Sequence, residues 1–126
     1  SLNRSLTLVN TTSNTLGVIY KGGSPFIHNY KAPPTAGENT FIGINSGNFT
    51  MTGSFLQASY NIGVGNYSLL SLTTGSNNSA FGYQSLYTNT MGSNNSAFGY
   101  QSLFSNTTGT FNSAFGYQSL YTSLIC

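Results

Sequence analysis

One segment of the sequence occurs three times, beginning at Gly75, Gly92 and Gly109, and this repeat limits the folds open to the chain. Residues 75–86 return unchanged as residues 92–103, and they return again as residues 109–120 with changes only at positions 110 and 111. Near-verbatim repetition at a fixed period, here 17 positions, is typical of stacked copies of one small unit. Since such a short unit cannot bury a core by itself, we expect identical positions to form columns along the stack.

The residues within one repeat favour short β-strands. Residues 78–82 and 83–87 are two runs that mix apolar, aromatic and small polar side chains, and turn-forming residues separate successive repeats. Runs of this length suit strands, and the repeat has no apolar i, i+3, i+4 spacing. We predict an all-β fold, a parallel β-solenoid or β-roll with two short strands per coil and a rise of about 4.8 Å per coil. An antiparallel meander of hairpins is the alternative, but it would place identical residues in unlike environments.

Weaker copies of the repeat precede the three strong ones. Residues 61–69 keep the Asn, Gly, Ser and Leu of the motif, and residues 39–47 form a still earlier copy. An insertion around residues 54–59 separates these two copies. We therefore predict five coils, which begin at Asn39, Asn61, Asn78, Asn95 and Asn112.

The repeated string Asn-Ser-Ala-Phe-Gly-Tyr-Gln-Ser-Leu, with its Asn-Thr-Thr-Gly spacer, resembles the head repeats of trimeric autotransporter adhesins. It is also similar to repeats in tail-fibre-like proteins of phages and large viruses. The resemblance covers residues 39 to about 122. It implies a left-handed parallel β-roll in which three chains pack around one axis. The 17-residue period is longer than the usual repeat of that family.

Residues 1–38 read differently from the repeat region at 39–126. Residues 16–20 and 25–30 flank a Gly-Gly pair, which is a β-hairpin signal, and the alternation at residues 5–9 predicts a short strand. The prolines within residues 31–37 indicate a stiff linker. We expect residues 1–38 to act as a cap on the solenoid or as an arm that reaches a neighbouring subunit, because the edge strands of a solenoid must be covered.

The scarcity of charge limits the possible functions. Charged residues make up 3% of the chain, against roughly 25% in ordinary globular proteins, and residues 39–126 contain no Asp, Glu, Lys, Arg or His. Because catalysis and metal binding need titratable groups in one place, we predict no enzyme, no metal and no cofactor. We interpret His28 as an exposed hairpin residue and Cys126 as a terminal thiol. With few titratable groups, stability is expected to change little between about pH 4.5 and 8. The sequence has no track of basic residues that would indicate nucleic-acid binding, and it has no apolar run long enough to span a membrane.

Several columns follow from the period. We expect two apolar columns, buried inside the coil or against a partner chain, at Phe81, Phe98, Phe115 and at Leu86, Leu103, Leu120. On this view Phe98→Ala would cost about 3–5 kcal/mol by leaving a cavity. A column of stacked, hydrogen-bonded side chains is expected at Asn78, Asn95 and Asn112. An aromatic column for partner contact or sugar stacking is expected at Tyr83, Tyr100 and Tyr117. Possible N-glycosylation sequons outside residues 1–38 lie at Asn48, Asn66, Asn77, Asn94 and Asn106.

These patterns favour a structural or adhesive fibre subunit over two other functions. A carbohydrate-binding, lectin-like head that uses exposed Tyr residues is the main alternative. An ice-binding solenoid would need a regular Thr array, and the Thr50-Met51-Thr52 sequence does not by itself provide one. We predict an extracellular, cell-surface or virion-surface glycoprotein. Its expected partner is itself, in a homotrimer or head-to-tail filament, with a host-surface glycan or protein as a further class of partner.

Overall fold

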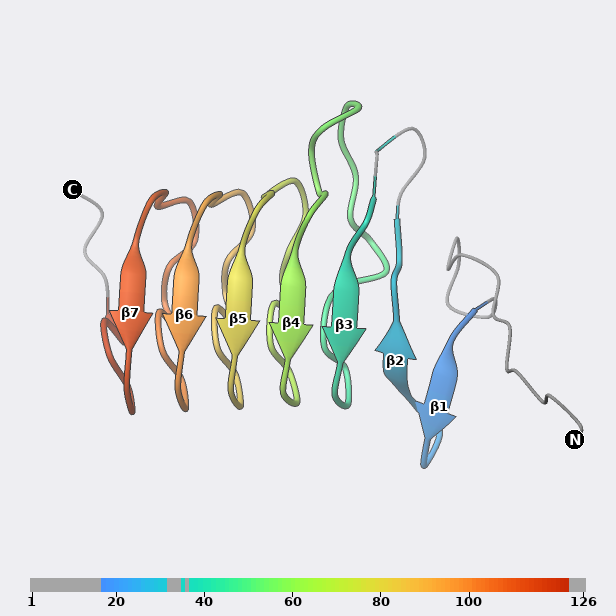
Figure 1. The fold of residues 1–126 in the computed structure, drawn as a ribbon, viewed down its shortest axis with the longest axis horizontal. Coiled ribbons are helices and arrows are strands. Elements are labelled where there is room, and N and C mark those ends of the chain that lie inside the picture. Colours follow the sequence, from blue (N-terminus) through green and yellow to red (C-terminus); the bar gives the residue numbers. More distant parts are fainter. Residues whose placement is uncertain (1–16, 32–34, 36, 123–126) are drawn as a thin grey trace, which may run out of the picture.

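The computed structural model of this chain describes residues 17–31, 35 and 37–122. In that part of the chain there is no helix, and seven short strands form one sheet in chain order (Figure 1). The strands are β1 (Ile19–Lys21), β2 (Ser24–His28), β3 (Thr40–Ile42), β4 (Ile62–Val64), β5 (Ser79–Phe81), β6 (Ser96–Phe98) and β7 (Ser113–Phe115). The predicted all-β fold class is confirmed.

Strands β3 to β7 are parallel and lie in register. Ser79 of β5 pairs with Ser96 of β6, which pairs with Ser113 of β7, so each of these strands follows the one before it by one sequence period. The same interval separates β4 from β5, and a longer interval separates β3 from β4. Figure 1 shows the chain winding from one strand to the next as a row of coils. The prediction of a parallel β-solenoid is confirmed, and the antiparallel meander is excluded.

Each coil contains one strand and not the two that we predicted. The second predicted strand, residues 83–87, consists of turns because Gln84 (φ 54°) and Leu86 (φ 51°) adopt the left-handed conformation, which a strand does not contain. Gly82 forms the corner between strand and turns, with φ 135°. A side chain at Gly82 would overlap the carbonyl oxygen of Gly99 in the next coil, so glycine is required there.

The longer interval between β3 and β4 reflects an inserted loop of five residues, because the paired positions are 22 apart in sequence here and 17 apart in the later coils. The backbone N–H of Thr52 donates to Thr73 O and that of Ala58 donates to Thr74 O, both at 3.0 Å, which places the extra residues at positions 53–57. This region was predicted to hold an insertion, with bounds that differ by one or two positions. The loop protrudes from the row of coils (Figure 1) and leaves Phe55 and Leu56 exposed.

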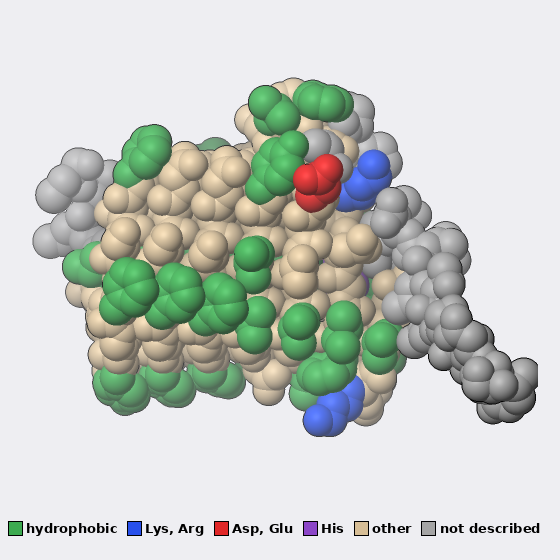
Figure 2. Space-filling view, in the orientation of Figure 1, with side chains coloured by type: hydrophobic (Ala, Val, Ile, Leu, Met, Phe, Trp, Pro, Cys, Tyr) green, Lys and Arg blue, Asp and Glu red, His purple; other side chains and the backbone are tan. Residues whose placement is uncertain are grey.

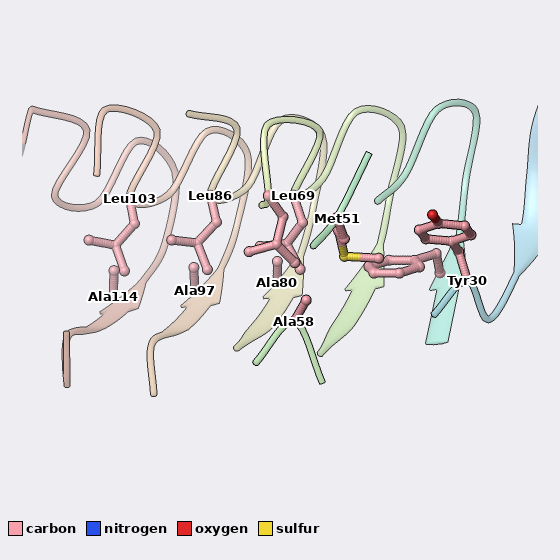
Figure 3. Packing of buried hydrophobic residues seen from close by; sticks show 11 residues of the cluster. Tyr30, Met51, Ala58, Leu69, Ala80, Leu86, Ala97, Leu103 and Ala114 are labelled. Atoms are coloured by element: carbon pink, nitrogen blue, oxygen red, sulfur yellow. The ribbon is translucent and has the colours of Figure 1, made fainter. Parts of the chain in front are cut away.

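The interior of the solenoid is narrow. The middle residue of each repeat strand points inward and is alanine in β5, β6 and β7, namely Ala80, Ala97 and Ala114. Figure 3 shows a leucine from the turns of one coil lying over the alanine of the next coil, as Leu86 lies over Ala97. The buried apolar residues are Tyr30, Phe41, Met51, Ala58, Leu69, Leu72, Ala80, Leu86, Ala97, Leu103 and Ala114.

The predicted hairpin is confirmed as β1 and β2, which are antiparallel and are joined by Gly22 and Gly23. Strand β2 also pairs antiparallel with β3, with Ile27 opposite Ile42 and His28 opposite Phe41. The hairpin therefore covers the first parallel strand of its own solenoid and continues the same sheet. We expected this segment to be either a cap on the solenoid or an arm to a neighbouring subunit, and within this chain the hairpin lies where a cap would lie.

His28 is buried, so its interpretation as an exposed hairpin residue is wrong. Its ring stacks on Phe49 with 4.4 Å between centroids and lies 4.9 Å from the ring of Phe41. Nε2 lies 2.8 Å from Ser46 O, and Nδ1 accepts a hydrogen bond from the Tyr30 backbone N–H at 3.2 Å. This pattern fits the neutral tautomer with the proton on Nε2. Burial lowers the pKa of His28 below 6.5, and the hydrogen bond to the Ser46 carbonyl opposes that shift in part.

Candidate assembly surface

The asparagine column is a continuous hydrogen-bonded ladder. The Oδ1 of Asn78 accepts from both the backbone N–H and the Nδ2 of Asn95, and the Nδ2 of Asn78 donates to Asn61 Oδ1 and to Gly92 O. All the hydrogen-bonding capacity of this amide is used within the coils. The structure thus brings together the predicted Asn78, Asn95 and Asn112, and it extends the column to Asn39 and Asn61.

A second amide ladder was missed in the sequence. The Nδ2 of Asn106 donates to the Oδ1 of buried Asn89 at 2.9 Å. These residues are 17 positions apart, so the period alone could have identified the pair. A third ladder lies at the surface, where Gln101 Nε2 donates to Gln84 Oε1 at 2.7 Å and Gln118 Nε2 donates to Gln101 Oε1 at 2.9 Å. Side-chain ladders of this kind hold neighbouring coils in one register.

The two predicted apolar columns lie in different places. Leu86 and Leu103 are fully buried, and Leu120 in the last described coil is half exposed. The phenylalanine column lies on the outer face of the sheet, with Phe115 68% exposed. Its placement inside the coil is therefore wrong, because alternation along Ser-Ala-Phe sends alanine inward and the next residue outward.

The outer aromatic residues stack on one another from coil to coil. Ring centroids are 4.8 Å apart between Phe81 and Phe98 and 5.0 Å apart between Phe98 and Phe115, and the rings are nearly parallel. The predicted tyrosine column stacks in the same way, at 5.4 and 5.1 Å. A third column, which the sequence analysis did not single out, consists of Tyr87, Phe104 and Tyr121. Because each ring covers part of the next ring's face, these columns leave less aromatic face for a sugar to stack on.

One row of outward side chains crosses the entire sheet. The strand register places one apolar residue from each strand in this row, and the row ends in the phenylalanine column. We call this row the apolar stripe; its members are Ile19, Ile27, Ile42, Val64, Phe81, Phe98 and Phe115. Figure 2 shows the stripe as a band of hydrophobic side chains, with the charged side chains lying outside it.

The sequons differ in accessibility. Asn66, Asn77 and Asn94 are exposed, the last two at equivalent positions of neighbouring coils, and Asn48 is half-buried. The Oδ1 of Asn66 accepts from the Ile44 N–H, and the Oδ1 of Asn48 accepts from the N–H and hydroxyl of Thr50. Asn106 is buried, and its amide donates to Asn89 and Gly109. A glycan on Asn106 does not fit this fold.

Residues 17–31, 35 and 37–122 contain no cluster of three or more His, Cys, Asp or Glu that could hold a metal ion. In the same part of the chain, no helix is long and apolar enough to cross a membrane. Cys126 lies outside the described residues. We base the proposed function on the aromatic columns and the apolar stripe. In comparisons with known proteins, the chain matches no protein-family model, no curated protein and no solved structure.

Proposed function

We propose that this chain is a structural subunit of a fibre and that it self-assembles by packing its coils against other copies. The observation that carries the proposal is that stacked aromatic columns line the outside of a coil whose residues 39–126 contain no charged side chain. The β-solenoid itself is an elongated repeat fold of the kind that fibres use.

A protein that stays monomeric needs surface features that oppose self-association. Monomeric soluble proteins rarely expose contiguous apolar patches of more than a few hundred Å². Natural sheets also place charged residues, lysine above all, where association must be prevented. Strands β3 to β7 and their turns have no such residue, and they present ordered rings that lose little side-chain entropy on packing. Self-association is the outcome that this combination favours.

We also propose that the fibre lies outside a cell or on a virion surface and that it contributes to adhesion. The resemblance of the repeats to adhesin and tail-fibre repeats supports this location. Exposed sequons at Asn77 and Asn94 are compatible with it. The carbohydrate-binding alternative is less favoured, because the exposed tyrosine rings stack on one another.

The test is sedimentation velocity of the full chain across about two decades of micromolar concentration, with electron microscopy of the same samples. We expect mass to increase with concentration and elongated particles to form. Tyr100→Lys should weaken the association, while Thr108→Lys, on an exposed turn of the same coil, adds the same charge away from the aromatic columns. A chain that sediments as a compact monomer throughout would refute the proposal.

A further inference from the structure

We infer that the apolar stripe is the surface on which two copies of this chain pack face to face, with their stripes antiparallel. The inference rests on the proposed self-association and adds the surface, the partner and the orientation. The partner is a second copy because strands β3 to β7, which provide most of the stripe, belong to a region with no charged residue to attract a charged ligand or to repel an identical surface.

The stripe changes size along its length. Ile19, Ile27 and Ile42 lie on one side of Val64, and the three phenylalanines of β5, β6 and β7 lie on the other side. If two copies packed with parallel stripes, rings would oppose rings at one end and isoleucines would oppose isoleucines at the other, which leaves a wedge-shaped gap. Antiparallel stripes place a large side chain opposite a smaller one on both sides of Val64, and this arrangement fills space evenly.

This arrangement fixes which residues meet. A two-fold axis parallel to the strands would pass over Val64, so that Val64 faces the partner's Val64. Phe81 then faces the partner's Ile42, Phe98 faces the partner's Ile27, and Phe115 faces the partner's Ile19. Apart from the central Val64 pair, each contact joins an aromatic ring to a branched aliphatic side chain.

The size of the surface predicts a weak dimer. Six strand spacings of about 4.8 Å make the stripe about 29 Å long, and five residues across each strand and its flanks add a width of about 16 Å. Each copy would bury roughly 450 Å², or roughly 900 Å² in total, below the roughly 1,200 Å² of the smaller stable interfaces. We therefore expect a dissociation constant in the micromolar range, with the contact reinforced when many subunits are aligned in a fibre.

Cysteine crosslinking tests the orientation. In a Cys126→Ser background, single cysteines are placed at Val64, Ile27 or Phe98 and treated with a bismaleimide too short to span four strand spacings, about 19 Å. Antiparallel packing predicts that Val64→Cys crosslinks to itself, whereas Ile27→Cys and Phe98→Cys do not crosslink alone but do crosslink when mixed. Parallel stripes, including three copies around one axis, would let each of the three positions crosslink to itself.

A charge substitution tests the surface independently. Phe98→Lys should weaken self-association roughly tenfold or more, because it places a charge in an apolar contact, and Thr108→Lys should not. Circular dichroism of both variants checks that the coils remain folded, and the Val64→Cys result stands even if Phe98→Lys unfolds. A chain that associates without a Val64 crosslink, or with self-crosslinks at all three positions, would overturn this inference and leave the proposed function intact. A chain that is monomeric at every concentration would overturn both.

Discussion

Asn95 donates twice to one atom, the Oδ1 of Asn78 in the coil before it: its backbone N–H and its side-chain Nδ2 each lie 3.1 Å from that oxygen. Asn78 is fully buried, so this oxygen has no access to water if the donors are removed. The same pair of hydrogen bonds recurs from Asn39 to Asn112. The column therefore sets both the axial position of each coil and the penalty for displacing it.

Asn95→Ala should destabilise the chain by about 2–4 kcal/mol. It leaves the Oδ1 of buried Asn78 and the carbonyl oxygen of half-buried Gly109 with one donor each in place of two, and it removes the acceptor of the N–H and Nδ2 of Asn112. Ser96→Ala, at the adjacent outward position, should change stability by less than about 0.5 kcal/mol. Denaturant unfolding followed by circular dichroism measures both. Equal effects of the two substitutions would contradict the structural role of the column.

Leu103→Ala should cost more than Phe98→Ala in the isolated chain. Leu103 is fully buried, so truncation leaves a cavity and costs about 2–5 kcal/mol. Phe98 is half-buried on the outer face and stacks on Phe81 and Phe115, so that its truncation leaves no closed cavity and a cost of about 1–2 kcal/mol is expected. The sequence analysis expected a cost of about 3–5 kcal/mol for Phe98→Ala from a cavity, and the outer position of Phe98 lowers that expectation for the isolated chain. Unfolding at a concentration below that of self-association would show which of the two losses is larger.

Gly99→Ala should be much more disruptive than Gly116→Ala. Both glycines have φ beyond +120°, so alanine strains the backbone at either site by about 1–3 kcal/mol. Only at Gly99 does the added Cβ also overlap the carbonyl of the next coil, whereas nothing lies within 4 Å of it at Gly116. The difference between the two variants in denaturant midpoint isolates the overlap. Matching midpoints would show that the coils separate easily at this corner.

His28 should make stability depend on pH, contrary to the expectation of little change between about pH 4.5 and 8. Burial lowers its folded pKa below 6.5, so protonation favours the unfolded chain. The contribution of neutral, buried His28 to the free energy of unfolding is complete above about pH 6.5, the pKa in the unfolded chain. This contribution is lost as the pH falls below that value toward the pKa in the folded chain. His28→Gln should flatten the profile. Melting temperatures measured from pH 7.5 downward would argue against this role if they rose on acidification, or if the two proteins gave the same slope.

The sequence was informative where a property repeats and less so where it depends on one dihedral angle. The 17-residue period predicted the parallel stack, the asparagine column and the buried leucines at positions 86 and 103, because identical residues in a stack must share one environment. The prediction of a second strand in each coil was wrong, because the composition of residues 83–87 does not show that Gln84 and Leu86 have positive φ.

The position of the phenylalanine column shows a similar limit. In a short Ser-Ala-Phe strand, either alanine or phenylalanine could point inward, and only one of the two phases suits the narrow coil. The burial of His28 depended on where the hairpin folds back onto β3, and a single sequence provides no periodic signal for that contact. The 17-residue period thus predicted which residues form columns, but the backbone conformation determines which of these columns are buried.

The identity of residues 78–86 and 95–103 makes the length of the body adjustable in fixed steps. A coil that bonds to the coil before it and the coil after it through the same atoms can be duplicated without changing any neighbour's partners. Each additional 17-residue copy would lengthen the rod by about 4.8 Å and leave its cross-section unchanged. Reach would then be set by copy number alone, so unequal recombination within the repeated segment would produce longer or shorter rods while each coil kept its sequence.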